Sequence, residues 1–168
     1  CELKSSNYWT VEKMRDSIME QAFSKGPTLV IVNTKKLASK LACACRDLNT
    51  EADVFHLSTN MCPAHRKEII TNRIDKESLE KARRKGKAVV CISTGLIEAG
   101  VDVDFDVIIR SVAGLDSCTQ AAGRCNRDAN RPGGRVILIN PAGNLERLDS
   151  LRELEIGREI AMGMICDC

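Results

Sequence analysis

The chain has 168 residues, 43% of them apolar, which is enough for one domain with a sizeable core. Its formal net charge is only +2, so binding to a nucleic acid must come from local placement of charge and not from the field of the whole molecule. Aromatic residues make up 3%, which argues against a single-strand binder that stacks bases on rings.

The sequence contains no apolar run of membrane-spanning length, and its polar opening stretch is unlike a signal peptide. We therefore expect no membrane partner and a cytoplasmic location. The nine cysteines include the pairs Cys43/Cys45 and Cys166/Cys168 but no C-x-x-C, so a metal site is not expected and the thiols suit a reducing cytosol. A start at Cys1 in place of Met suggests a fragment of a longer protein.

Apolar runs of strand length alternate with longer helical patterns along the whole chain. Most runs are continuous and rich in Val and Ile, as in strands that are buried on both faces of a parallel sheet. The expected strands are Thr28–Val32, Asp53–Leu57, Lys87–Ile92, Asp106–Ile109 and Arg135–Ile139. The expected helices are Val11–Phe23, Lys35–Asp47, Pro63–Lys85 (long enough to break near Asp75), Cys118–Asn126 and Leu151–Met164.

Strand–helix alternation with short links predicts an α/β fold, with an open, mainly parallel sheet of five or six strands and helices on both faces. Residues 1–168 are expected to form a single domain. Residues 145–168 are expected to form a closing helix, or to lead into a domain that is missing from this sequence.

Polar residues follow the expected strands at the edge where open parallel sheets bind ligands. They are Asn33-Thr34, Ser58-Thr59, Ser93-Thr94-Gly95 and Arg110-Ser111. Each polar group can simply cap the helix that follows, and capping is the plainer interpretation of any single one. Several on one edge favour a track for a phosphate backbone, because a helix N-terminus is also an anion site. We expect Thr34, Thr94 and Gly95 to bind nucleic acid. We expect the same of Arg66, which lies at the start of the helix that follows Ser58-Thr59.

The segment Ser117 to Arg127 predicts a second kind of site. Ser117 and Gln120 have the spacing of a capping box, and on the resulting helix Gln120, Arg124 and Arg127 fall at i, i+4 and i+7 on one face. Two guanidiniums at this spacing suit a triphosphate, whereas the plainer alternative is a solvated basic face. Gly123 favours the first interpretation, because a glycine inside a helix is unfavourable unless a close backbone approach requires it.

A third segment follows the strand that ends near Ile92. Thr94-Gly95 supplies a hydroxyl and an approachable backbone, Gly100 allows a tight turn, and Asp102 comes just after it. Asp102 could contact a ribose hydroxyl or orient one of the arginines. The alternative for Asp102 and Asp104 is solvation of the loop before the next strand.

These segments resemble conserved motifs of superfamily-two helicases. Motif V is matched by Thr94, Gly100 and Asp102, and motif VI by the run Gln120 to Arg127. Motif IV resembles the strand Leu29–Asn33 followed by Thr34. The run has Ala121 where the family has its first arginine, which puts one family contact in doubt. The order and spacing match the family's carboxyl-terminal RecA-like domain over roughly residues 25 to 145.

A closer resemblance is to the CRISPR-associated helicase–nuclease of type I systems. It lies in the runs His56 to Arg66, Glu98 to Asp106 and Gln120 to Arg127. The resemblance implies an ATP-driven motor that moves 3′ to 5′ on single-stranded DNA and is recruited by a CRISPR surveillance complex. In this role Arg124 and Arg127 would be catalytic arginine fingers, and Gly100, Asp102 and Gln120 would contact ATP.

The sequence lacks a G-x-x-x-x-G-K-S/T phosphate loop, an Asp-Glu box after a strand and a His-Asp pair. ATP with Mg²⁺ is therefore expected to bind mainly to a missing first RecA-like domain, and a nuclease domain would also lie elsewhere. The fragment alone is expected to be inactive. The alternatives are a domain of another superfamily-two DNA or RNA helicase, a non-enzymatic nucleic-acid binding module, and a protein whose arginine face binds a protein partner.

Overall fold

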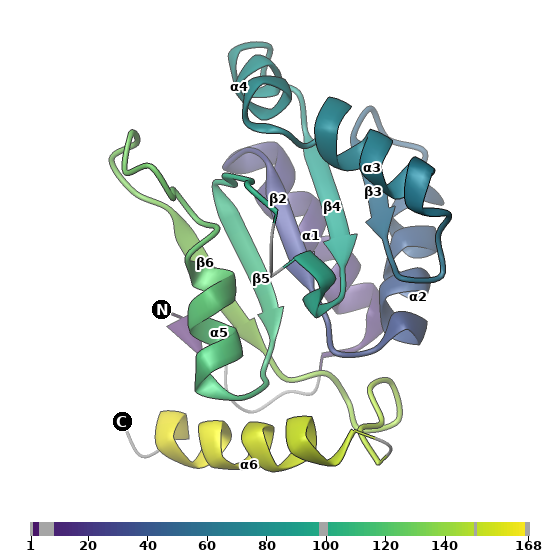
Figure 1. The fold of residues 1–168 in the computed structure, drawn as a ribbon, viewed down its shortest axis with the longest axis vertical. Coiled ribbons are helices and arrows are strands. Elements are labelled where there is room, and N and C mark those ends of the chain that lie inside the picture. The colour runs from purple at the N-terminus through teal and green to yellow at the C-terminus, as the bar shows by residue number, and fades with distance from the viewer. Residues whose placement is uncertain (1, 4–8, 98–100, 150, 167–168) are drawn as a thin grey trace.

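The computed structural model describes residues 2–3, 9–97, 101–149 and 151–166. Within them, six parallel strands form one sheet in the order β1-β6-β5-β2-β4-β3, which confirms the expected α/β fold (Figure 1). The strands are β1 (Glu2–Leu3), β2 (Thr28–Ile31), β3 (Asp53–Leu57), β4 (Val89–Ser93), β5 (Val107–Ser111) and β6 (Arg135–Ile139). The helices are α1 (Val11–Ser24), α2 (Lys35–Arg46), α3 (Pro63–Asn72), α4 (Lys76–Arg84), α5 (Leu115–Ala122) and α6 (Arg152–Cys166), with a 3-10 turn η1 at Gly95–Ile97.

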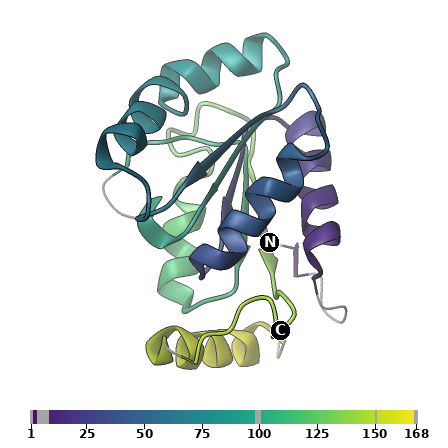
Figure 2. The same ribbon diagram turned by 90° about the vertical axis from the view of Figure 1, so that its right-hand side faces the viewer.

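Helices cover both faces of the sheet, as Figure 2 shows. Side chains at alternate strand positions point to opposite faces, so Leu29 and Ile31 pack with α3, α4 and α5 while Val30 packs with α1 and α2. Both faces are therefore apolar, which explains why the strands read as continuous apolar runs and not as alternating ones.

Helix α6 lies across the carboxyl edge of the sheet, where the strands end (Figure 1). Its Ala161 is fully buried in a small core with Val112, Cys118 and Leu138. A Cβ added at Gly157 of α6 would lie 3.1 Å from Gly114 Cα, so the two backbones pack in close contact at the start of α5.

The predicted elements agree with the structure to within two residues at most of their ends. The strand Arg135–Ile139 has the predicted bounds, and the long helical segment breaks beside Asp75, as expected. There the Asp75 carboxylate caps α4 by accepting hydrogen bonds from Glu77 N–H at 3.2 Å and Ser78 N–H at 3.4 Å. This cap explains the start of a new helix after α3.

The prediction for the helix Cys118–Asn126 was wrong at both ends. Helix α5 begins three residues earlier, its N-cap is Gly114, and it makes no side-chain cap hydrogen bond, so the capping box does not form. It ends at Ala122, and Gly123 is its C-cap, not an interior residue. The chain then turns away, and Asn126 adopts a left-handed φ of 48°. The arginines after Gly123 therefore lie on a loop.

Candidate functional site

Two segments that are far apart in the sequence meet at the amino edge of the sheet, where the strands begin. Phe105 N–H donates to Arg124 O at 2.9 Å, and Asn126 N–H donates to Phe105 O at 3.0 Å. These hydrogen bonds belong to a short parallel bridge between Phe105 and Cys125. The bridge places an acidic segment before β5, residues 102–106, against an arginine-rich loop before β6, residues 124–131. We call these the acidic segment and the arginine loop.

The acidic segment alternates between apolar and charged side chains. Val103 and Phe105 are fully buried in the core beneath α3, α4 and α5. Asp102, Asp104 and Asp106 lie between and beside them, and all three carboxylates pair with basic side chains from α4 or from the loop after α5. One side of this segment thus anchors it in the core while the other faces the arginines.

Arg127 makes two contacts with this acidic segment. Its backbone N–H donates to Asp104 Oδ1 at 2.8 Å, and its Nη1 lies 3.4 Å from Asp102 Oδ1. An ion pair between Asp102 and one of the arginines is one of the two roles considered from the sequence. The Arg127 side chain remains 41% exposed, so its guanidinium can still reach a ligand.

The helix face expected to carry Gln120, Arg124 and Arg127 does not exist. Gln120 is exposed on α5, whereas both arginines follow the end of that helix. Arg124 is half-buried, and its backbone is engaged in the bridge to Phe105. The two arginines therefore share a loop, and the i, i+4, i+7 spacing does not describe their geometry.

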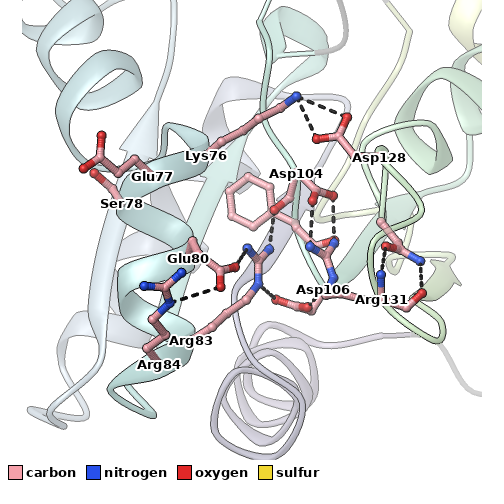
Figure 3. Close-up of polar contacts among 12 residues, drawn as sticks. Lys76, Glu77, Ser78, Glu80, Arg83, Arg84, Asp104, Asp106, Asp128 and Arg131 are labelled. Atoms are coloured by element: carbon pink, nitrogen blue, oxygen red, sulfur yellow. Dashed lines mark hydrogen bonds and ion pairs between the residues drawn. The ribbon is translucent and has the colours of Figure 1, made fainter.

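Arg131, which sequence reasoning missed, is at the centre of the contacts in this region (Figure 3). Its Nη1 and Nη2 bind the two oxygens of Asp104 at 2.6 and 2.7 Å, and Nη2 also donates to Phe105 O at 3.0 Å. Its Nε lies 2.9 Å from Asp106 Oδ1. A forked guanidinium can make all these contacts together, while a lysine cannot.

Asp104 is 6% exposed, so the alternative of a solvated loop residue does not hold for it. Burial by itself would raise the pKa of Asp104, but the hydrogen bonds from Arg131 and from the Arg127 N–H hold it below its usual value. The hydrogen bonds to Asp104 in turn raise the pKa of Arg131. The pair is therefore a permanent ion pair at neutral pH.

Helix α4 contributes two further basic residues that the sequence did not single out. Lys76 Nζ lies 3.2 Å from Asp102 Oδ2 and 2.9 Å from Asp128 Oδ2, and Arg83 Nε lies 2.7 Å from Asp106 Oδ2. The alternation D-x-D-x-D at 102–106 was the available signal for a segment with one charged side. This pattern could not identify the basic residues that pair with the aspartates, because Lys76 and Arg83 come from another helix.

The opposite, carboxyl edge holds the residues predicted to follow a strand of nucleic acid. Thr34 follows β2 and Thr94-Gly95 follows β4, and β2 and β4 are neighbours in the sheet. Thr34 Oγ1 accepts a hydrogen bond from Leu37 N–H at 3.3 Å, so Thr34 does cap α2. Gly95 is exposed, and Thr94 is half-buried.

Arg66 lies in the first turn of α3 and is half-buried. The loop that leads to it is tied to the start of α2, because Lys35 Nζ donates to Asn60 Oδ1 at 3.0 Å. The structure thus brings the ends of β2, β4 and β3 together at one edge. Gly100, predicted to contact ATP, lies outside the described residues.

A buried polar network supports this edge directly before Thr34. Asn33 N–H donates to Glu146 Oε1 at 2.6 Å, Asn33 Nδ2 donates to Oε2 at 3.0 Å, and Arg110 Nη1 donates to Asn33 Oδ1 at 2.7 Å. Burial raises the pKa of Glu146, against the opposing hydrogen bonds from Asn33. Arg110, expected after its strand, lies inside β5 and is 2% exposed.

Among the described residues, no three His, Cys, Asp or Glu side chains gather in a way that could hold a metal ion. Burial raises the pKa of Cys45 to about 11 and that of Cys91 to about 12, so both are unreactive thiols that pack as small apolar groups. The described part of the chain also contains no helix that is long and apolar enough to cross a membrane.

Residues 24–130 match the family described as "CRISPR-associated nuclease/helicase Cas3, C-terminal". That range contains all nine residues proposed from the sequence for catalysis, ATP contact or nucleic-acid contact. A Cas3 nuclease/helicase of Methanothermobacter thermautotrophicus is 31% identical over 118 residues, which cover 69% of this chain and 13% of that protein. The chain therefore spans about an eighth of this relative's length.

Solved structures show the same fold. The crystal structure of T. fusca Cas3-AMPPNP matches with a TM-score of 0.70 at 20% identity, over 85% of this chain and 18% of that chain. A chain of the pre-nicking CRISPR RNA-guided surveillance complex matches with a TM-score of 0.62 at 18% identity, over 85% of this chain and 19% of that chain. At these identities the likeness establishes the arrangement of sheet and helices.

Proposed function

The chain belongs to the family of C-terminal domains of the CRISPR-associated nuclease/helicase Cas3, and we therefore propose that it is the second motor domain of an ATP-dependent single-stranded DNA translocase in CRISPR interference. In this role it completes an ATP site at one edge of its sheet and contacts the DNA strand at the other. We further propose that residues 1–168 form one domain, closed by α6, and that it acts in the cytoplasm.

The placement of Arg127 carries this proposal. Its backbone is fixed by Asp104, its guanidinium is steadied by Asp102, and its side chain still reaches solvent. An arginine with these properties can act across a domain boundary, where it stabilises the charge that develops on the phosphates in the transition state. Arg124, on the same loop, is proposed as the second finger, and Gln120 as a nucleotide contact.

ATP with Mg²⁺ would be bound mainly by the first motor domain, because this sequence has no phosphate-binding loop of the G-x-x-x-x-G-K-S/T type. The chain's own contribution would be the arginines, with Asp102 and Gly100 near the nucleotide. A nucleotide site in the family agrees with the AMPPNP complex of T. fusca Cas3.

The DNA contacts are proposed for the carboxyl edge. Thr34, Thr94 and Gly95 present hydroxyl and backbone groups at the ends of neighbouring strands, and Arg66 adds a positive charge from α3. Such groups bind phosphates without reading bases, so binding should be nearly independent of sequence.

The remaining partners follow from the family. We propose that this domain works beside a first RecA-like domain and a nuclease domain of the same protein, and that a CRISPR surveillance complex recruits the whole. Support for recruitment is the related chain present in the surveillance complex structure.

The test is Arg127→Ala in the full-length protein, measured by single-stranded-DNA-stimulated ATP hydrolysis and by DNA binding. We expect kcat to fall by about 10³-fold or more while DNA binding is retained, and Arg127→Lys to restore little, because lysine lacks the planar fork. Arg73→Ala is the control, since Arg73 is exposed at the end of α3 and pairs with Glu68. Near-normal turnover of Arg127→Ala would refute the proposal.

A further inference from the structure

We infer that Arg131 and Asp104 are positioning residues for Arg127: together they clamp the loop 124–131 and set the direction in which the Arg127 side chain leaves it. The inference rests on the proposed function of Arg127 and adds two residues to it. Neither is expected to touch the nucleotide, because Asp104 is 6% exposed and the Arg131 side chain is directed at the acidic segment.

The clamp reaches Arg127 through a single shared carboxylate. Asp104 Oδ1 accepts hydrogen bonds both from Arg127 N–H, at 2.8 Å, and from Arg131 Nη2, at 2.7 Å. Asp104 Oδ2 accepts from Arg131 Nη1 at 2.6 Å, so the carboxylate cannot rotate while Arg131 holds it. The orientation of this carboxylate therefore fixes the backbone of Arg127.

The loop also braces Arg131 itself. Asn126 Nδ2 donates to Arg131 O at 2.9 Å, and Arg131 N–H donates to Asn126 Oδ1 at 3.2 Å. Asn126 and Ala129 have left-handed φ values of 48° and 51°, a conformation that asparagine adopts readily but that is unfavourable for alanine. The loop thus contains an unfavourable backbone conformation two residues after Arg127, and the Asp104–Arg131 pair holds the loop in place.

Stabilisation of the fold alone is a weak explanation for this pair. Buried ion pairs can often be replaced by apolar residues without loss of stability, because removing both charges from water is costly. Here the pair includes the backbone of the proposed arginine finger as a third member. A displacement of about 1 Å in a catalytic group can cost on the order of 100-fold in rate, so a clamp at this point has a functional reason.

The first experiment uses the full-length protein with Arg131→Lys and Asp104→Asn, alone and combined with Arg127→Ala. We expect each single variant to lower kcat by about 10- to 100-fold with a much smaller change in the KM for ATP. In the Arg127→Ala background, neither substitution should lower kcat further, because residues that act through one another are not additive. Arg84→Lys is the matched control, since Arg84 is exposed on α4 and pairs with Glu80.

The second experiment measures amide hydrogen exchange in the same proteins, which reports on the loop without using catalysis. We expect exchange of the peptide covering 124–131 to accelerate in Arg131→Lys and Asp104→Asn by a larger factor than exchange of β2 and β4, whose change reports only the lower global stability. An equal acceleration in the loop and in β2 and β4 would show a general structural role and overturn the inference.

The outcomes separate the inference from the proposed function. If Arg127→Ala leaves turnover intact, the proposed function fails, while faster exchange in the loop would still support the clamp. If Arg127→Ala abolishes turnover but Arg131→Lys and Asp104→Asn leave kcat and loop exchange unchanged, the clamp is refuted and the proposed function stands.

Discussion

Asp102 and Arg127 form an exposed ion pair, Oδ1 to Nη1 at 3.4 Å, and Lys76 binds the other oxygen of the same carboxylate at 3.2 Å. Asp102 is thus shared between α4 and the loop that carries the proposed finger. Exposed pairs of this kind are weak and screened by salt. Arg127 can therefore leave Asp102 for a phosphate, while Lys76 still holds the carboxylate in position.

The first prediction concerns this shared carboxylate in the full-length protein. An exposed ion pair is worth about 0.2–1 kcal/mol, so Asp102→Asn should lower kcat by no more than about fivefold, far less than Arg127→Ala. The effect should shrink as ionic strength rises. ATPase assays at several salt concentrations check this, with Asp128→Asn as control, because Asp128 pairs with the same Lys76. A loss as large as that of Arg127→Ala would give Asp102 a direct role.

The second prediction concerns the 168-residue chain alone. It should show negligible ATP hydrolysis with Mg²⁺ and single-stranded DNA, because the sequence has no loop to cradle the phosphates. A steady-state phosphate-release assay with the purified chain measures this. Robust turnover that survives further purification would contradict the division of labour proposed for the two motor domains.

The third prediction concerns the carboxyl edge. In the full-length motor, Arg66→Ala and Thr94→Ala should weaken single-stranded DNA binding equally on unrelated sequences, since the contacts are to phosphate. Arg66→Ala should also reduce the salt dependence of binding, by about 0.7 in the log–log slope for one lost phosphate contact. Fluorescence anisotropy over a salt series tests both, with Lys67→Ala, an exposed neighbour on α3, as control. Unchanged binding in both variants would mean that these residues serve only the local fold.

The fourth prediction concerns the stability of the isolated chain. The pKa of Asp104 is held below its unfolded value, so its contribution to stability is present above about pH 4 and is lost as the pH falls through the lowered folded value. Asp104→Asn should cost roughly 3 kcal/mol at pH 7, as for one broken buried ion pair. Denaturant unfolding at several pH values should show this difference shrinking below about pH 4. A difference independent of pH would exclude the ionised carboxylate as its source.

Much of the fold could be predicted from the sequence because its signals are local. Val and Ile runs such as Arg135–Ile139 report burial on both faces without any knowledge of the neighbouring strands. The end of α5 could not be predicted in this way. The spacing of Gln120, Arg124 and Arg127 continues a helical pattern, and the turn that breaks it depends on pairing with Phe105, about twenty residues earlier.

The candidate site shows the same difference between residues that a local motif identifies and residues that are defined by contacts with distant parts of the chain. Arg127 and Asp102 were proposed from their motifs, but Arg131 was not, because its contacts with Asp104 and Asp106 arise only from the topology of the sheet. The same is true of Glu146, which lies 113 positions after Asn33 in the sequence and binds it.

Strand β5 connects the two proposed sites, with the acidic segment at its beginning and Arg110 near its end. Its five residues span about 17 Å at roughly 3.3 Å per residue, and all five are buried. Such a strand can neither stretch nor bend appreciably, so it would form a stiff connection between the proposed nucleotide edge and the proposed DNA edge. If the two edges act as proposed, a displacement of the arginine loop would reach the DNA edge as tilting of the entire domain.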